Sequence, residues 1–403
     1  MMLNIEQKYT GKTSFLHLGF RPFFFAALSF GTVSVVLWLI MYSLGKNLLP
    51  NGYNLISWHA HEMIYGFASA TITGFLLTAV KNWTGVQTIH HKPLLAVFLF
   101  WLFARVLAFI PGDWVLPTLA VIDSLYLLFV TIAYSLPVFQ KKQWSNLAFS
   151  GKLLLIFIGN VVFYLGLLGY IENGVHYGLY IGFYMVLAVI FNMGRRVIPF
   201  FIEKGLGCPF EAKNYRWVDI SSLWLFLAFS IVEIFYPFNH PTVKYIALAL
   251  ASVLVILHSA RLVGWYHKGI WKKSLLWVLY VGYFWVVIGF VLKITSVLFG
   301  TSPFLVIHAF AYGGIGMITA GMMARVSLGH TGNNVFEPPK ILNWIFALLF
   351  IGAIVRVFLP LILSQYYLQL IEISQLLWIA SFLLFFIKYA PMLIKARVDG
   401  RYG

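Results

Sequence analysis

Long apolar runs constrain this chain more than any other feature of its sequence. A helix that crosses a membrane needs about 20 mostly apolar residues, and on that criterion we expect about twelve such helices, joined by short loops. The chain is therefore predicted to be an all-α integral membrane protein, with residues 1–403 forming a single polytopic domain. The predicted helices are 22–44, 59–80, 93–110, 114–139, 150–171, 177–201, 217–236, 242–264, 274–299, 303–327, 341–363 and 367–389.

The composition agrees with a membrane protein and argues against nucleic acid as a partner. Hydrophobic residues make up 61% of the chain and charged residues only 10%, whereas about a quarter of a soluble domain is charged. The net charge is +16, but the Lys and Arg are scattered between apolar runs, so the expected partner is the lipid bilayer. Cys208 is the only cysteine, which excludes an internal disulfide and disfavours a Cys-ligated iron–sulfur cluster.

The basic residues predict the topology. Positive loops stay on the cytoplasmic side of a membrane. Of the 28 Lys and Arg, 23 fall in the N-terminus, the even-numbered loops and the C-terminus, and only Lys46 and Lys244 fall in the opposite loops. The remaining three, Arg105, Lys293 and Arg356, lie inside predicted helices. Both termini are therefore predicted to be cytoplasmic.

A pattern built on a histidine occurs in the second predicted helix and again in the tenth. Counted from His61 or from His308, a Tyr follows at +4, a Gly at +5 and at +13, and Thr-Gly at +23 and +24. In the next helices Arg105 corresponds to Arg356. The pattern predicts an internal repeat.

The repeat divides the chain into three units of four helices. Helices 1–4 (residues 20–139) correspond to helices 9–12 (residues 274–389). Helices 5–8 (residues 150–264) form a degenerate middle copy, indicated by His176 with Tyr180 four positions later.

Four histidines begin even-numbered helices, which the topology places at the periplasmic face: His59, His61, His176 and His308. Neutral imidazole is the commonest metal ligand and a frequent axial ligand of haem iron. His59 and His61 lie about 200° apart around a regular helix, so one metal cannot easily take both, and a second metal nearby is expected. The alternative is that each is an interfacial polar residue.

Charged side chains at a similar depth extend this candidate site. A charge inside the bilayer is costly and usually faces a functional interior. Glu62 is a candidate proton relay or a carboxylate beside the metal, or else an interfacial residue. Arg105, Lys293 and Arg356 are candidates for pairing with haem propionates, since guanidinium binds carboxylates in bidentate fashion. The alternative is a salt bridge to Asp123 or to Glu372.

Other polar residues are given structural roles. His258 is interpreted as structural, and ordinary aromatic packing is favoured for Tyr65, Tyr180 and Tyr312 over a hydrogen bond to a buried group. A second polar set lies at the predicted cytoplasmic ends of helices, where the topology already explains its charge: Arg21, Trp83, Arg195, Arg196, Arg325 and His330.

Several short motifs, in order along nearly the whole chain, resemble the NnrS family of bacterial membrane proteins. They are Gly-Phe-Arg-Pro-Phe-Phe (19–24), Trp-His-Ala-His-Glu-Met (58–63), Gly-Phe-Leu-Leu-Thr-Ala-Val (74–80) with Asn-Trp-Thr-Gly (82–85), Arg-Arg-Val-Ile-Pro-Phe-Phe (195–201) and Ala-Arg-Val-Ser-Leu-Gly-His-Thr-Gly (324–332). The resemblance implies a twelve-helix protein of the bacterial inner membrane that binds haem, expected as haem b, and copper, and that protects against nitric oxide.

The resemblance also implies a more distant kinship with haem–copper oxidases and nitric oxide reductases, which ligate haem from helices two and ten. By that analogy His61 and His308 form the axial pair, or one of them pairs with His59. The full three-histidine copper site of the oxidases is missing here, so copper is expected among His59, His176 and Glu62.

The resulting hypothesis is an enzyme that reduces nitric oxide to N2O at a haem–metal site near the periplasm, with Glu62 relaying protons and an unknown electron donor. Two alternatives remain open. One is a haem protein that binds nitric oxide or protects against it without turnover. The other is a polytopic transporter, since internal repeats around a charged site are common in that class.

Overall fold

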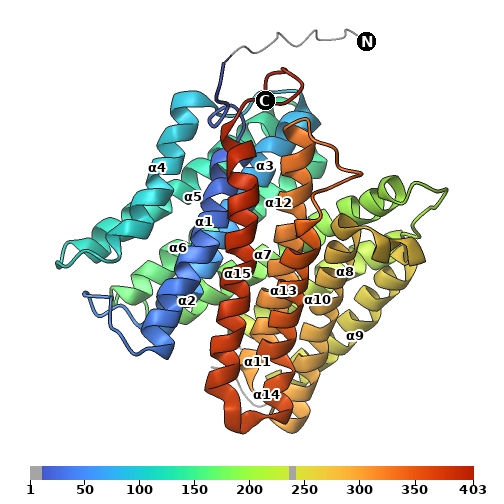
Figure 1. Cartoon of the computed structure of the whole chain (residues 1–403). Coiled ribbons are helices and arrows are strands. Elements are labelled where there is room, and N and C mark those ends of the chain that lie inside the picture. Colours follow the sequence, from blue (N-terminus) through green and yellow to red (C-terminus); the bar gives the residue numbers. More distant parts are fainter. Residues whose placement is uncertain (1–10, 236–241) are drawn as a thin grey trace. The chain divides into compact units, whose positions relative to one another are not determined.

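The computed structural model describes residues 11–235 and 242–403 and is almost entirely helical (Figure 1). In this part of the chain the β-type pairing is an isolated bridge between Thr13 and Lys395. The helical elements are α1 (Phe20–Trp38) with η1 (Leu39–Ser43), α2 (Leu55–His61) with η2 (Glu62–Ala68) and α3 (Ser69–Thr84), α4 (His91–Leu107), α5 (Val115–Gln140), η3 (Trp144–Asn146) with α6 (Leu147–Leu167), α7 (Gly174–Gly205), α8 (Arg216–Phe235), α9 (Val243–Trp265), η5 (Lys268–Lys272), α10 (Ser274–Phe299), α11 (Pro303–His308) with η6 (Ala309–Gly316) and α12 (Met317–His330), α13 (Ile341–Val357) with α14 (Leu359–Ile362), and η7 (Ser364–Tyr366) with α15 (Tyr367–Ile394).

These elements join into long helices that confirm the predicted polytopic, all-helical class. Within the described residues, eleven continuous helices are long and apolar enough to cross a membrane. The remaining predicted span, the third in the chain (93–110), corresponds to α4, which has 17 residues. The ends agree with the predicted segments to within a few residues, because apolar length and the polar loops between the helices are visible in the sequence.

The two helices that carry the repeated histidine pattern are the most enclosed. In Leu55–Thr84 and Pro303–His330, 83% and 78% of the apolar window are buried inside the protein, more than in any other span of the described chain. Most other spans expose at least half of theirs, as expected of helices that face lipid. The histidine-bearing helices therefore supply interior surface, where a site can be shielded from lipid.

The described chain forms two compact units. Unit 1 contains residues up to Gly182 together with Met323–Pro338 and Phe382–Gly403, and unit 2 contains Phe183–Met322 and Pro339–Ser381. Within unit 1, α3 packs against α1 and α5, and α5 packs against α4 and α6. Within unit 2, α10 packs against α9, η6 and α13, and α9 packs against α8. The chain passes between the units inside α7, α12 and α15 and in the loop between α12 and α13.

The two ends of the described chain meet in unit 1. Besides the bridge between Thr13 and Lys395, the Ala396 amide donates to the Lys12 carbonyl at 3.3 Å. The N-terminal and C-terminal segments consequently lie at the same end of unit 1 (Figure 1). An even number of crossings requires this arrangement. The side of the membrane on which the termini lie stays a prediction.

Candidate functional site

His61 and His308 share a local backbone feature that their sequence pattern does not reveal. Each is the last residue of a short α-helix and is followed by a π-helical segment, Glu62–Ala68 in one case and Ala309–Gly316 in the other. A π turn adds a residue to the helical repeat and turns the side chains that follow it, and such turns occur often at functional sites. The two segments therefore share a backbone distortion as well as a sequence pattern.

The tyrosines four residues after the histidines are hydrogen-bonded across to neighbouring backbone. The Tyr65 hydroxyl donates to the Gly178 carbonyl at 2.6 Å, and the Tyr312 hydroxyl donates to the Ser374 carbonyl at 2.9 Å. Both tyrosines are buried, so these bonds satisfy hydroxyls that are removed from water. The hydrogen-bonding role, which the sequence made the less favoured interpretation, is the one found for both.

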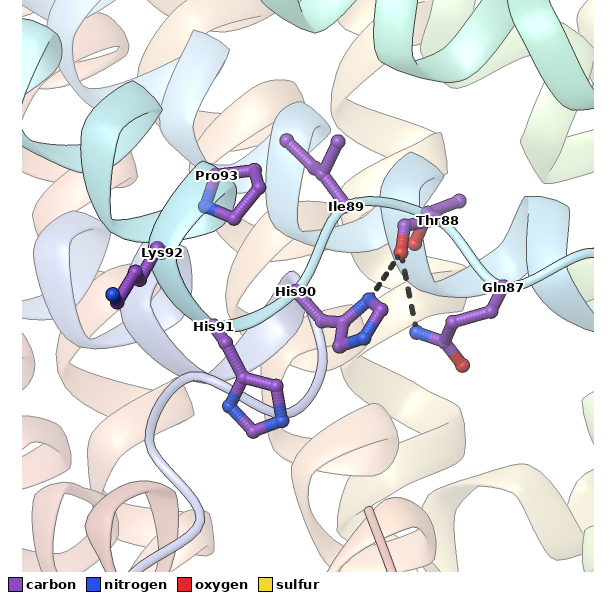
Figure 2. A pocket seen from close by; sticks show the side chains of 7 residues that line it. All are labelled: Gln87, Thr88, Ile89, His90, His91, Lys92 and Pro93. Atoms are coloured by element: carbon purple, nitrogen blue, oxygen red, sulfur yellow. Dashed lines mark hydrogen bonds between the residues drawn. The ribbon is translucent and has the colours of Figure 1, made fainter.

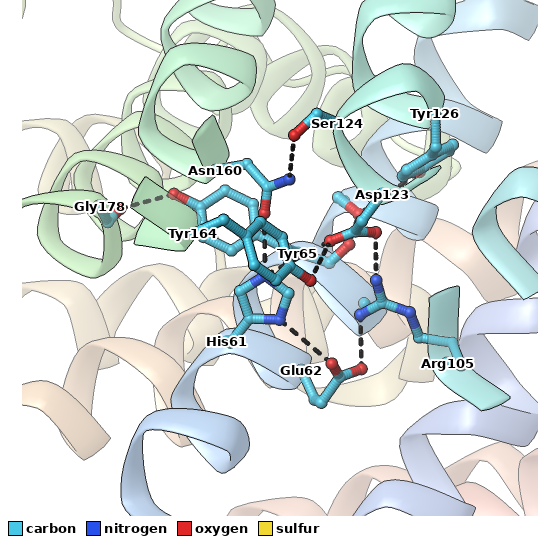
Figure 3. Close-up of polar contacts among 12 residues, drawn as sticks. His61, Glu62, Tyr65, Arg105, Asp123, Ser124, Tyr126, Asn160, Tyr164 and Gly178 are labelled. Atoms are coloured by element: carbon cyan, nitrogen blue, oxygen red, sulfur yellow. Dashed lines mark hydrogen bonds and ion pairs between the residues drawn. The ribbon is translucent and has the colours of Figure 1, made fainter. Parts of the chain in front are cut away.

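The centre of unit 1 holds a buried polar cluster around His61 (Figure 3). Its imidazole is fully buried. Nδ1 lies 3.1 Å from Glu62 Oε1, while Nε2 lies 2.8 Å from Asn160 Oδ1 and 3.4 Å from Asp123 Oδ2. Asn160 donates to Ser124 Oγ at 3.4 Å, which is consistent with its amide oxygen facing the imidazole. Both ring nitrogens therefore face side-chain oxygens that can accept a hydrogen bond.

Arg105 lies between the two carboxylates of the cluster. Its guanidinium forms ion pairs with Glu62 and with Asp123, and all three side chains are buried. The hydroxyl of Tyr164 donates to Asp123 Oδ2 at 3.1 Å. The salt-bridge interpretation of Arg105 is thus what the geometry shows, with Glu62 as a second partner that the sequence analysis did not assign to it.

Arg105 alone does not balance the charges of this cluster. One guanidinium faces two carboxylates, so with a neutral His61 the group carries one net negative charge. Buried unbalanced charge is costly. The cluster is therefore a charged group inside the helical bundle, in direct contact with the imidazole of His61. Both ring nitrogens of His61 are in contact with side-chain oxygens, and ligation of haem iron by His61 stays a prediction.

His308 is arranged differently and fits a metal ligand better. Its Nδ1 lies 2.7 Å from the Phe304 carbonyl, which fixes the proton on Nδ1 and leaves the lone pair on Nε2. A histidine that ligates a metal commonly makes such a bond with its other nitrogen. Arg356 Nη2 lies 3.4 Å from His308 Nε2, and its guanidinium lies 5.8 Å from the Tyr367 ring centroid. In sequence, Ala309 takes the place of Glu62 here.

His61 belongs to unit 1 and His308 to unit 2. The pairing of His61 with His308 as axial ligands therefore stays a prediction.

The other two candidate ligands stack on aromatic rings in unit 1. The His59 ring is 4.2 Å from that of Trp38 at 14°, and the His176 ring is 4.2 Å from that of Tyr180 at 27°. In the described part of the chain, no group of three His, Cys, Asp or Glu side chains is arranged to hold a metal ion.

The remaining propionate candidate, Lys293, is in unit 2, where its Nζ lies 2.7 Å from Glu233 Oε1. Neither of the salt-bridge partners considered from the sequence is involved in this contact. Glu233 was missed, although it is an isolated carboxylate within a predicted span, which is itself a signal of a buried polar site.

Part of the second polar set holds the C-terminal segment in place. Arg21 is fully buried and caps the end of α15, where the last helical carbonyls have no partner within the helix. Nearby, the His17 ring stacks on that of Tyr402 at 4.1 Å, and burial together with the charge of His91 lowers the pKa of His17 to about 4. The carbonyls that accept from Arg21 belong to Met392, Leu393, Lys395 and Gly403.

A surface pocket of about 570 Å³ lies at the loop between α3 and α4, lined by the consecutive residues 87–93 (Figure 2). His90 Nδ1 and Gln87 Nε2 lie 3.0 and 3.4 Å from the Thr88 carbonyl. The pocket is open and shares no residue with the buried cluster. The cluster, with its buried charged side chains, is therefore the stronger candidate for chemistry.

A many-helix membrane fold with a buried histidine, two carboxylates and an arginine defines a polytopic membrane protein with a polar site inside its helical bundle. The NnrS protein family matches residues 14–397, nearly the whole chain. The chain belongs to the NnrS family. No curated protein matches it.

Proposed function

We propose that this protein is a haem protein of the bacterial inner membrane that acts in the nitric oxide response, with copper as a second metal, and that it reduces nitric oxide to N2O. Membership of the NnrS family supports the role in the nitric oxide response and the haem–metal character. The observation that supports the haem assignment is the geometry of His308: its Nδ1 donates to the Phe304 carbonyl, so Nε2 would be the ligating atom, and the Arg356 guanidinium that now lies 3.4 Å from Nε2 would have to turn to a propionate when haem is bound.

The residues that would hold haem are His308 as an axial ligand and Arg356 as the partner of a propionate. Haem supplies a site that binds nitric oxide and exchanges electrons with a donor outside this chain. Copper rests on membership of the NnrS family, and its candidate ligands are His59, His176 and Glu62.

The reaction consumes protons as well as electrons: two NO, two electrons and two protons give N2O and water. The chain's own contribution is the cluster of unit 1. There His61 and Arg105 contact the carboxylates of Glu62 and Asp123 in a buried interior. Glu62 remains the candidate relay residue.

The first experiment is an optical spectrum with metal analysis of the purified protein, followed by detection of N2O from nitric oxide and a reductant. We expect a reduced haem b spectrum that is lost in His308→Ala. The matched control His90→Ala, which alters the surface loop, should keep it.

Haem that persists in His308→Ala would contradict the ligand assignment. Haem without N2O would reject the reductase activity and favour a protein that binds nitric oxide without turnover, the alternative that the NnrS match also accommodates. A colourless, metal-free protein with full helical content would reject both and favour a transporter.

A further inference from the structure

Unit 2 contains a second polar axis, separate from the histidine-bearing site. Asp219, Phe226 and Glu233 are spaced seven residues apart on α8, so they lie on one face of that helix. At 1.5 Å per residue the two carboxylates are about 21 Å apart, which is most of the roughly 30 Å hydrocarbon core of a bilayer. Two acidic groups on one helix face at this separation indicate polar sites near opposite ends of a span.

The Asp219 end is a connected network of buried and partly buried side chains. Arg261 Nη2 lies 2.9 Å from Asp219 Oδ1, and its Nη1 donates to the Tyr283 hydroxyl at 2.9 Å. That hydroxyl lies 2.6 Å from His258 Nδ1. Arg195 adds a longer ion pair to Asp219 at 3.6 Å. The network leads from a partly exposed carboxylate to a fully buried imidazole.

His258 lies at the end of this network, and only its Nδ1 is hydrogen-bonded within it. Because Arg261 can only donate, the Tyr283 oxygen accepts from it, and its own hydrogen is directed to His258 Nδ1. His258 Nε2 is buried and has no hydrogen-bond partner in the structure. Buried polar atoms are nearly always satisfied. The unmatched nitrogen therefore points to a group that exchanges a proton.

The Glu233 end is the pair of Glu233 with Lys293. Their Oε1 and Nζ atoms lie 2.7 Å apart, and the Tyr184 hydroxyl donates to Glu233 Oε2 at 3.3 Å. Both charged residues are buried, at 6% and 7% exposed. Paired charges inside a membrane span commonly mark ion pathways or proton relays.

An aromatic layer separates the two ends: Phe191, Phe226, Phe229 and Phe290, all buried. On one side, the His258 ring lies 4.7 Å from Phe191 and stacks on Phe290 at 5.5 Å and 10°. On the other, the Tyr184 ring lies 5.8 Å from that of Phe229.

The rings of the aromatic layer touch one another, with Phe191 to Phe226 at 4.6 Å and Phe229 to Phe290 at 5.4 Å. A constriction lined by apolar rings excludes water and so blocks ions. The layer is therefore an apolar barrier between the two polar ends.

We propose that unit 2 contains a proton-selective pathway from Asp219 through His258 to Glu233, gated by this aromatic layer. The ion pairs explain why such a pathway would select protons over Na⁺ and K⁺. An arriving proton neutralises Asp219 or Glu233 by forming an O–H bond, whereas Na⁺ or K⁺ would have to displace Arg261 or Lys293 from its carboxylate. One proton enters at one end for each that leaves at the other, and no electron is transferred.

The test is proton flux in liposomes that contain the full-length protein, driven by a K⁺ diffusion potential and followed with a trapped pH dye, without nitric oxide or reductant. Wild type should conduct slowly. Phe226→Ala, which opens the layer, should conduct roughly tenfold faster because water can then enter the constriction. Phe226→Leu, which keeps an apolar side chain there, should stay near wild type.

The carboxylate and the imidazole are tested in the open background. Adding Glu233→Gln or His258→Phe to Phe226→Ala should return the flux to the wild-type level, whereas adding Glu172→Gln, at an exposed loop carboxylate, should not. Phe229→Ala serves as a second opening variant if Phe226→Ala does not fold. The proposal is overturned if a folded opening variant conducts no faster than wild type, if its flux survives Glu233→Gln, or if it passes K⁺ as readily as protons.

Discussion

At the scale of single residues, Arg105 supplies the positive charge between the two carboxylates of the buried cluster in unit 1. Replacing it by Gln leaves Glu62 and Asp123 facing each other without their cation, and breaking a buried ion pair in this way costs about 3–5 kcal/mol. We expect Arg105→Gln to lower the apparent melting temperature in detergent markedly. Arg105→Lys should recover only part of the loss, since an ammonium group cannot bridge two carboxylates as a guanidinium does.

The controls for this prediction separate charge balance from side-chain packing. Arg401→Gln, at a side chain that is 65% exposed, should change stability by no more than about 0.5 kcal/mol. Neutralising Glu62 and Asp123 together with Arg105 should restore much of the stability, because an uncharged set leaves no buried charge unpaired. If the triple variant is as unstable as Arg105→Gln, the cluster is held by shape and not by charge.

The sequence predicted the charged members of this cluster but missed the neutral ones. Glu62, Arg105 and Asp123 stand out because a charge in an apolar span is costly. Asn160 carries no such signal, and its contact with His61 joins residues 99 positions apart. Such a pairing depends on how helices pack, which local pattern does not encode.

At the scale of elements, the π-helical turn after His61 depends on a glycine. A β-carbon at Gly66 would lie 2.6 Å from Phe30 Cε1, 3.0 Å from Glu62 Oε2 and 3.1 Å from Arg105 Nη1. Gly66→Ala should therefore destabilise the protein by roughly 1–3 kcal/mol, the usual cost of overpacking, and displace Arg105 from Glu62.

The matched control is Gly151→Ala on α6, where a β-carbon would meet nothing within 4 Å. There the substitution should be neutral or stabilise the helix by up to about 1 kcal/mol. The measurement is the melting temperature of each variant in the same detergent, compared with wild type. Equal behaviour would mean that the turn tolerates a side chain and that Gly66 is incidental.

Element boundaries followed from the sequence, but the irregular turns did not. The length of the apolar run predicted a helix over 274–299, and α10 has the same bounds. The π turns of η2 and η6 arise where glycines allow close packing with neighbouring helices. Their sequences also satisfy an ordinary α-helical pattern, so the added residue could not be predicted, although the shared spacing from His61 and His308 marked both places.

At the scale of the whole molecule, the side of the membrane on which every later loop lies depends on whether α4 crosses it. Its 17 residues span about 26 Å, slightly less than the roughly 30 Å core. If α4 crosses, the count is even and both termini share one side. The bridge between Thr13 and Lys395 requires this parity, so we expect α4 to be a full crossing despite its length.

The single cysteine makes this topology measurable. Cys208 is exposed in the loop between α7 and α8, which twelve crossings place in the cytoplasm with the basic residues. A membrane-impermeant maleimide should leave Cys208 unlabelled in cells with an intact inner membrane and label it after lysis. In a Cys208→Ser background, Glu172→Cys, in the loop between α6 and α7, should label in intact cells. The reverse pattern would mean that one helix before residue 172 fails to cross, and α4 would be the first to reassign.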